Sequence, residues 1–212
     1  TDATFLSGFY YRHRAETVSH TIYFRKAWLN ISGGDTVIAQ GSTSAAPAFI
    51  YHNGKFTVAY LDASGNIVTA YQNGSSWTTF GSAITNALGA LQFASGNDGT
   101  TLYLSYIDAD NVGHVLKSLN GTSSWVALGG TFGSSVSDLR MQVNPASGYP
   151  TVLYLSGSTA YFRDWDGSAW GTQRTLASSL LSADFAFDGS GNRTFAAVGT
   201  GYALTTYYYK SG

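Results

Sequence analysis

One short motif occurs three times in this chain. It consists of Asn-Gly or Asp-Gly, two or three small residues and then Trp, at residues 73–77, 120–125 and 166–170. Together with Trp28, its tryptophans form a series separated by 49, 48 and 45 residues. A period of this length is typical of propellers and other repeat arrays, in which each repeat is one supersecondary unit. The repeat restricts the possible folds more than any other feature of the sequence.

The stretches before each Trp predict antiparallel strands. In the repeat that contains Trp77 they read "AFIY", "FTVAYL" and "IVTAYQ", with the turn sequences "HNG" and "DASGN" between them. Runs rich in Val, Ile, Thr, Tyr and Phe, bounded by Gly, Asn and Asp, are typical of strands joined by hairpins. Because Asn-Gly readily adopts the positive φ of a tight hairpin, the motif marks the third corner of a four-stranded unit. We expect its Trp to begin the fourth strand and to pack between neighbouring sheets.

A repeated four-stranded unit of about 45 residues predicts an all-β fold, a β-propeller. We predict one propeller domain over residues 1–212. Its blades are expected at about residues 1–42, 43–86, 87–132, 133–176 and 177–212. The first and last blades each lack a strand, so the propeller is incomplete at both chain ends. Because an unpaired strand edge promotes aggregation, we expect closure by pairing of the terminal strands or by a partner chain, in a homo-oligomer or a larger parent polypeptide.

Composition argues against several classes of partner. Charged residues make up only 11% of the chain and the net charge is −1, so no basic face for nucleic acid is expected. No apolar run approaches the roughly 20 residues of a membrane-spanning helix, so membrane insertion is not expected. Cys is absent, which removes disulfides and thiolate chemistry. A chain rich in Ser, Thr, Gly and Tyr that begins without Met suggests a mature or excised protein at an extracellular, cell-surface or virion-surface location.

Catalytic motifs are not evident in the sequence. Eleven of the twelve acidic residues are Asp, and most of them lie in predicted turns, where Asp is favoured because its side chain bonds to the backbone of its own turn. Neither a G-x-S-x-G nucleophile motif nor an H-E-x-x-H metal motif occurs. We therefore predict that the protein is not an enzyme, with a glycosidase that uses two carboxylates as the alternative.

A calcium site is the weak alternative to having no cofactor. The loop that starts at Asp108 begins like an EF-hand, but Val112 and Leu119 stand where that motif needs oxygen ligands. A looser calcium site would use Asp108, Asp110 and Asn111.

A family resemblance rests on "NGSSWTTFGS" and "NGTSSWVALGG", which are preceded by "TVAYLD" and "LYLSYID". These stretches resemble the blades of bacterial and fungal β-propeller lectins, and similar repeats in secreted adhesins and phage tail fibres. The resemblance covers residues 43–212. The lectins that it most resembles have seven blades, whereas this chain has the length for about five. The resemblance implies shallow, repeated glycan sites in clefts between blades or on the loop faces.

Aromatic rings that stack on sugars, together with Asn and Asp that bind hydroxyl groups, are the expected ligand-binding residues. The set on one face is Trp77, Trp125, Trp170, Asn73, Asn120 and Asp166, and the set on the opposite face is Asp62, Asn66, Asp108, Asp110 and His114. Packing between blades alone would also explain the Trp series. The sequence thus predicts a lectin-like or receptor-recognition module whose partners are glycans or glycoconjugates, with a structural propeller of a virion or appendage as the first alternative and a glycoside-processing enzyme as the second.

Overall fold

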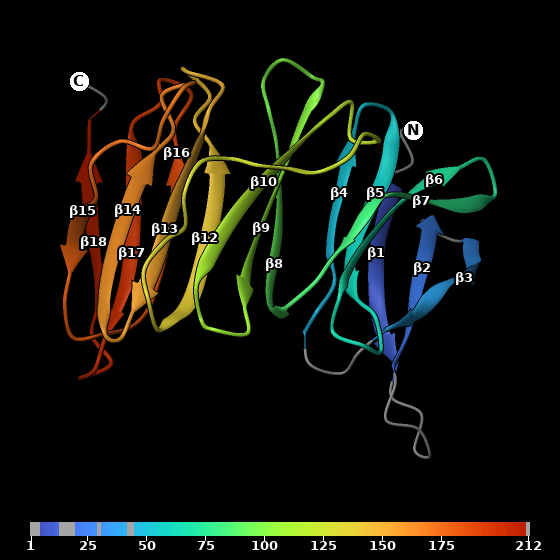
Figure 1. Ribbon diagram of the computed structural model, residues 1–212, viewed down its shortest axis with the longest axis horizontal. Helices are drawn as coiled ribbons and strands as arrows, with labels where there is room; N and C mark the ends of the chain where they lie inside the picture. The colour runs from blue at the N-terminus through green and yellow to red at the C-terminus, as the bar shows by residue number, and fades with distance from the viewer. Residues whose placement is uncertain (1–4, 13–19, 29–30, 42–44, 211–212) are drawn as a thin grey trace.

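The computed structural model describes the backbone of residues 5–12, 20–28 and 31–41, and both backbone and side chains of residues 45–210. The described part of the chain contains strands and turns and no helix (Figure 1). It therefore contains no helix that is long and apolar enough to cross a membrane. The prediction of an all-β protein is confirmed.

The described strands form five antiparallel sheets in chain order. The first sheet contains β1 (Phe5–Arg12), β2 (His20–Trp28) and β3 (Ile31–Gly41). The second contains β4 (Ala48–His52), β5 (Lys55–Leu61), β6 (Ile67–Asn73) and β7 (Ser76–Ile84). The third contains β8 (Ala87–Ser95), β9 (Thr101–Asp108), β10 (Gly113–Leu119) and β11 (Val126–Ala127). The fourth contains β12 (Val136–Val143), β13 (Pro150–Ser156), β14 (Thr159–Asp164) and β15 (Arg174–Ala177). The fifth contains β16 (Leu180–Phe187), β17 (Arg193–Gly199) and β18 (Leu204–Tyr209). We refer to these sheets as blades 1 to 5.

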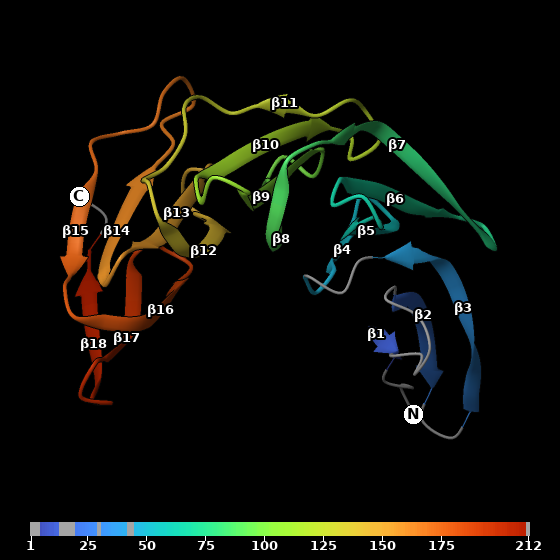
Figure 2. The same cartoon turned by 60° about the horizontal axis from the view of Figure 1, so that its bottom comes forward.

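The blades stand side by side around an arc that is open between its two ends (Figure 2). The first strands of successive blades, β4, β8, β12 and β16, are neighbours along the inside of the arc. Blades 1 and 5 have three strands each, and the described strands do not pair across the opening. The predicted β-propeller, incomplete at both ends, is therefore confirmed, and closure by pairing of the terminal strands is absent from the described residues.

Most of the hydrophobic core of the described residues lies between neighbouring blades, in three buried clusters. One buried cluster joins blades 2 and 3 and includes Leu61 and Leu104. A second joins blades 3 and 4 around Phe132, and a third joins blades 4 and 5 around Phe162 and Phe195. A single four-stranded sheet leaves both faces wet, so stacking of blades is what removes this apolar surface from water.

Trp125 and Trp170 each pack on the preceding blade. The indole N–H of Trp125 donates to the hydroxyl of Thr69 at 3.0 Å, and that of Trp170 donates to the carbonyl of Leu128 at 2.6 Å. A Cβ atom added at Gly81 would lie 3.0 Å from Cδ1 of Trp125. The expectation that these tryptophans pack between sheets is confirmed.

The repeated stretch also contains a Gly after the Trp, to which sequence analysis had given no separate role. Gly129, like Gly81, lies four residues after a motif Trp, has a positive φ and contacts the next blade's Trp. The corresponding position in blade 4 is Arg174. Blade 5 has no fourth strand with a Trp in the described residues. No indole of the next blade therefore lies against position 174, and a side chain larger than that of Gly fits there.

The start of the fourth strand varies among the blades. Trp77 lies in β7 and Trp125 immediately precedes β11, but Trp170 lies four residues before β15. For Trp170 the expected start is wrong. Trp170 instead forms an isolated β-bridge with Trp165, and the guanidinium of Arg163 donates to the carbonyls of Trp170 and Gly171, at 3.1 and 2.8 Å.

Candidate functional site

Two neighbouring clefts open on the face that carries the first and third hairpin turns of each blade. The cleft between blades 3 and 4, here cleft 3/4, has a volume of about 540 Å³. The cleft between blades 4 and 5, here cleft 4/5, has a volume of about 320 Å³. Their size suits one or two sugar rings, and clefts between repeats of a scaffold are frequent ligand sites.

Cleft 3/4 has an aromatic floor and a polar rim. The side chain of Tyr103 is buried at its base, and Lys117 lies opposite Tyr103 on the adjacent strand. The side-chain amide of Asn97 donates to the carbonyl of Pro145 at 2.7 Å, which joins a turn of blade 3 to a turn of blade 4. This bond fixes the distance between the two walls, so the cleft is built before any ligand arrives.

Asp98 at the rim of cleft 3/4 is held by its own turn. Its Oδ1 accepts hydrogen bonds from the amides of Thr100 and Thr101, and its Oδ2 accepts one from the Thr101 hydroxyl. Burial alone would raise the pKa of Asp98, but these hydrogen bonds outweigh burial and lower the pKa to about 2. Asp98 is therefore a structural anion rather than a proton donor.

Tyr149 and Trp165 form an aromatic ridge that both clefts share. Tyr149 is 39% exposed and Trp165 is partly buried. A Cβ at Gly167 would lie 2.8 Å from the Tyr149 hydroxyl, so Gly is needed for the ring to lie over this turn. Trp165 packs edge-on against Trp170, with ring centroids 5.3 Å apart. The ridge is thus an aromatic surface that is rigidly supported from below.

Cleft 4/5 contains a buried arginine. Arg193 is 8% exposed, and its guanidinium donates to Oδ2 of Asp164 at 2.8 Å. The guanidinium also lies 5.5 and 5.3 Å from the ring centroids of Phe162 and Phe187. The hydroxyl of Thr151 donates to the other oxygen of Asp164. Since a guanidinium carries five N–H donors, Arg193 retains donors beyond its bond to Asp164.

The corresponding space between blades 2 and 3 is occupied by His52. Its Nε2–H donates to the carbonyl of Thr100 at 3.1 Å, and its Nδ1 lies 2.8 Å from the Ser95 hydroxyl. A Cβ at Gly121 would lie 2.8 Å from the His52 ring. His52 is therefore a satisfied core histidine, and successive blade interfaces differ in what fills them.

The first predicted set of ligand residues lies mainly in packing or turn positions. Trp170 is 9% exposed, and the indole N–H groups of Trp125 and Trp170 bond to the preceding blade. Trp77 is partly buried and packs on a cluster of its own blade. Asn120 has a positive φ in its hairpin turn, and the Asn73 carbonyl accepts a bond from Ser76. Asp166 alone of this set lines one of the two clefts, and a ligand role for the set stays a prediction.

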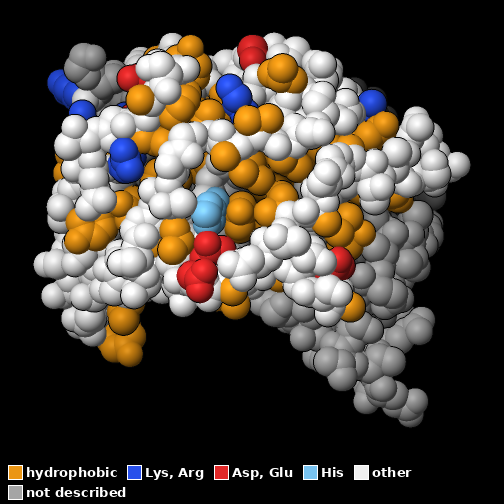
Figure 3. Space-filling view, in the orientation of Figure 1, with side chains coloured by type: hydrophobic (Ala, Val, Ile, Leu, Met, Phe, Trp, Pro, Cys, Tyr) orange, Lys and Arg blue, Asp and Glu red, His pale blue; other side chains and the backbone are white. Residues whose placement is uncertain are grey.

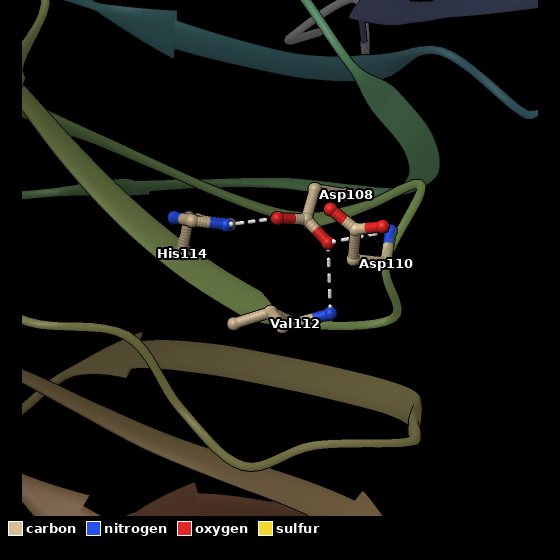
Figure 4. A network of polar contacts seen from close by, with 4 residues as sticks. All are labelled: Asp108, Asp110, Val112 and His114. Atoms are coloured by element: carbon tan, nitrogen blue, oxygen red, sulfur yellow. Dashed lines mark hydrogen bonds and ion pairs between the residues drawn. The ribbon is translucent and has the colours of Figure 1, made fainter.

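The second predicted set lies on the opposite face and bonds mainly within itself. Figure 4 shows Oδ2 of Asp108 facing Nε2 of His114 at 2.7 Å, while Oδ1 of Asp108 accepts from the amides of Asp110 and Val112. The His114 ring stacks on Tyr106, with centroids 4.8 Å apart. Burial alone would raise the pKa of Asp108. The hydrogen bonds that its carboxylate accepts, above all the one from His114, outweigh burial and lower this pKa.

Asp62 repeats this arrangement in blade 2. Its carboxylate accepts bonds from the amides of Ser64 and Asn66 and from the Asn66 side chain. A ligand role for these residues stays a prediction, as does calcium at Asp108, Asp110 and Asn111. Within the described residues no three His, Cys, Asp or Glu side chains gather in a way that could hold a metal ion.

Sequence analysis missed the residues that line the clefts most directly. They are Tyr103, Lys117, Tyr149, Trp165 and Arg193. The signal in the sequence was a residue that occurs in one repeat and is missing from the others. Trp165 is a second Trp directly before one copy of the motif, and the other two copies have none there.

Comparison with known proteins places the fold among solved β-propellers. No protein-family model matches the sequence, and no curated protein matches it. The BP39L lectin from Burkholderia pseudomallei is 12% identical with a TM-score of 0.67, over 99% of this chain and 67% of that one. A mutant of AofleA from Arthrobotrys oligospora is 12% identical with a TM-score of 0.65, over 97% and 70%.

The fucose-binding lectin of Aleuria aurantia, described as a six-bladed β-propeller, is 14% identical with a TM-score of 0.57, over 99% of this chain and 79% of that one. This lectin has also been solved with α-methyl-L-fucoside and with Fucα1-6GlcNAc. At these identities the likeness concerns the fold, and the resemblance to propeller lectins that the sequence predicts is present in the structure.

Proposed function

We propose that this protein binds carbohydrate in clefts 3/4 and 4/5, with the ridge of Tyr149 and Trp165 as the stacking surface. The observation that carries the proposal is this ridge, because it presents two aromatic rings to both clefts on a supported base. The C–H faces of sugar rings pack on such surfaces, while polar groups at the rim orient the hydroxyls. The propeller fold that the chain shares with lectins supports the same function.

Two adjacent shallow sites suit a branched or extended glycan better than a single sugar. Each site alone would bind weakly, and simultaneous occupation raises the overall affinity through the high effective concentration of the second group. In this proposal the glycan is met outside the cell, on a cell surface or at a virion surface.

The test is a glycan array followed by titration calorimetry with Trp165→Ala and Tyr149→Ala. Each substitution should weaken binding about fivefold or more, because loss of stacking on an aromatic ring costs on the order of 1 kcal/mol or more. Tyr202→Ala is the matched control, since Tyr202 is 83% exposed and lies outside both clefts. Unchanged affinity in both ridge variants, with the circular dichroism spectrum preserved, would refute the proposed site.

Assembly is a second candidate function, and the exposed edge of blade 5 favours it. Strand β18 ends its sheet, and its Leu204 and Tyr208 are 69% and 58% exposed. An edge strand with apolar side chains readily pairs with another strand. Light scattering should then show a defined oligomer that Leu204→Lys dissociates. A monomer at all concentrations would leave carbohydrate binding as the function.

A glycosidase receives no comparable support from the clefts. Asp98 and Asp164 have both carboxylate oxygens bonded to protein donors, and three bonds hold one oxygen of Asp166. Release of nitrophenol from nitrophenyl glycosides, abolished by one Asp→Asn substitution, would establish that activity.

A further inference from the structure

We propose that clefts 3/4 and 4/5 select acidic saccharides, whose carboxylate or sulfate groups bind Lys117 in the first cleft and Arg174 with Arg193 in the second. This inference rests on the proposed carbohydrate binding and names the class of sugar. It is argued from the hydrogen-bonding groups that the clefts leave available.

The cations of the clefts are incompletely neutralised. Among the described residues, the ion pairs of Lys and Arg join Arg140 to Asp138 and Arg193 to Asp164. Lys117 and Arg174 thus have no carboxylate partner in this part of the chain. Lys117 is also partly buried, and a cation that has lost part of its hydration is stabilised by an anion at contact distance.

The carboxylates of the clefts are mostly committed to their own loops. Both oxygens of Asp98 accept hydrogen bonds from Thr100 and Thr101, and both oxygens of Asp164 are bonded, to Thr151 and Arg193. Asp166 uses one oxygen for the amides of Ser168 and Ala169 and the Ser168 hydroxyl. The groups left to meet a ligand are therefore mainly N–H donors, which call for acceptors on the sugar.

Charge balance favours cleft 4/5 as the stronger anion site. Arg174, Arg193 and Lys210 line it against Asp164 and Asp166, so its side chains carry a net positive charge although the chain as a whole is at −1. The Arg193 guanidinium is bonded to Asp164 and lies near the Phe162 and Phe187 rings, and these contacts restrict its movement. An arginine fixed in this way binds a planar carboxylate without losing further side-chain entropy.

The distribution of charge over the molecule agrees with this assignment. In Figure 3 the Lys and Arg side chains visible on the described surface lie in its upper half, where some Asp side chains lie too, and the largest Asp group and the His lie lower. The upper rim is where β18 and β14 end in Figure 1, next to residues that line cleft 4/5. The visible cations are thus gathered on the side of the molecule that carries the clefts, whereas Asp side chains occur on both sides.

The experiment compares acidic sugars with uncharged partners of the same shape. Oligogalacturonate and its methyl ester share one sugar backbone but only the former is charged, and sulfated dextran and dextran form the second pair. Calorimetry on the whole protein should show binding of the charged member of at least one pair, tenfold or more above its neutral partner. Raising the salt from about 50 mM to about 500 mM should weaken that binding several-fold, because the Debye length shortens. Which pair shows the effect distinguishes carboxylate from sulfate.

Substitutions test which cation binds the acidic group in each cleft. Lys117→Gln and Arg174→Gln should each weaken acidic binding about tenfold or more, as expected for loss of one charge-assisted hydrogen bond. Lys55→Gln is the matched control, because Lys55 lies over the Tyr71 ring outside both clefts and should leave the affinity unchanged.

Failure of this inference differs from failure of the proposed function. Equal binding of charged and neutral partners that depends on Trp165, without response to Lys117→Gln, Arg174→Gln or salt, would overturn acid selectivity and leave carbohydrate binding in place. If no glycan in the array or in the two pairs binds, the proposed function and this inference both fall.

Discussion

Gly129→Ala tests whether the Trp–Gly contact between blades holds the propeller together. Gly129 has a φ of +74°, and an alanine there costs about 1 kcal/mol because Cβ meets the backbone in this conformation. Its Cβ would also lie 2.7 Å from Cδ1 of Trp170 and 3.0 Å from Cζ3 of Trp165. Overpacking of this kind typically costs about 1–3 kcal/mol, so a total loss of about 2–4 kcal/mol is expected.

Gly54→Ala is the control that separates strain from crowding. Gly54 has a φ of +73°, and no atom lies within 4 Å of an added Cβ. It should lose only the conformational part, about 1 kcal/mol. Both variants are measured by urea unfolding monitored by Trp fluorescence and by thermal melting, in which 1 kcal/mol corresponds to about 2–4 °C for a chain of this size.

The contact itself is measured by a double-mutant cycle of Gly129→Ala with Trp170→Leu. The Trp170→Leu substitution is destabilising alone, but it removes the indole atoms that the new methyl group at position 129 would meet. The two substitutions together should therefore cost about 1–2 kcal/mol less than the sum of their separate effects. Additive effects, or a Gly129→Ala loss no larger than that of Gly54→Ala, would refute the packing role assigned to the motif.

Three further predictions concern single polar groups. The pKa of Asp98 in the folded state is about 2, below its ordinary value of 3.8. The stability that this carboxylate contributes is therefore present above pH 4 and is lost as the pH falls toward 2. Asp98→Asn should flatten the acid-unfolding curve between these two pH values. Arg193→Met removes the partner of Asp164 in a partly buried site and should lower the free energy of unfolding by about 1–3 kcal/mol, and a loss below about 0.5 kcal/mol would contradict the pairing. The side-chain oxygen of Gln92 accepts the Met141 amide at 2.7 Å between β8 and β12, so Gln92→Leu should cost about 1–2 kcal/mol and speed hydrogen exchange at that amide.

The repeat predicted the blades because it encodes their packing. Trp125 and Trp170 recur at a fixed interval since each must reach the blade before it, and Gly81 and Gly129 recur because that contact leaves no room for Cβ. Turn chemistry was equally legible, since Asn-Gly and Asp-Gly mark hairpin corners by their positive φ. The short β11 and the late start of β15 were not predictable from the repeat, because the fourth strands pair differently: β11 pairs with β10 at Val126 and Ala127, and Trp170 forms an isolated bridge with Trp165 before β15 begins.

The same reasoning explains why repeated residues were a poor guide to the clefts. Residues that recur at equivalent positions in the blades make the contacts that every blade interface needs. Their side chains are therefore largely buried in packing and are not available to a ligand. What distinguishes one interface from the next is a side chain that the other blades lack: His52 fills one, Lys117 lines the second and Arg193 the third. Arg174 belongs to this group, because it stands where the motif otherwise requires Gly. In a propeller of this kind, the departures from the repeat are therefore where ligand chemistry should be sought, and replacing them should change binding while leaving the blade contacts of Trp125 and Trp170 intact.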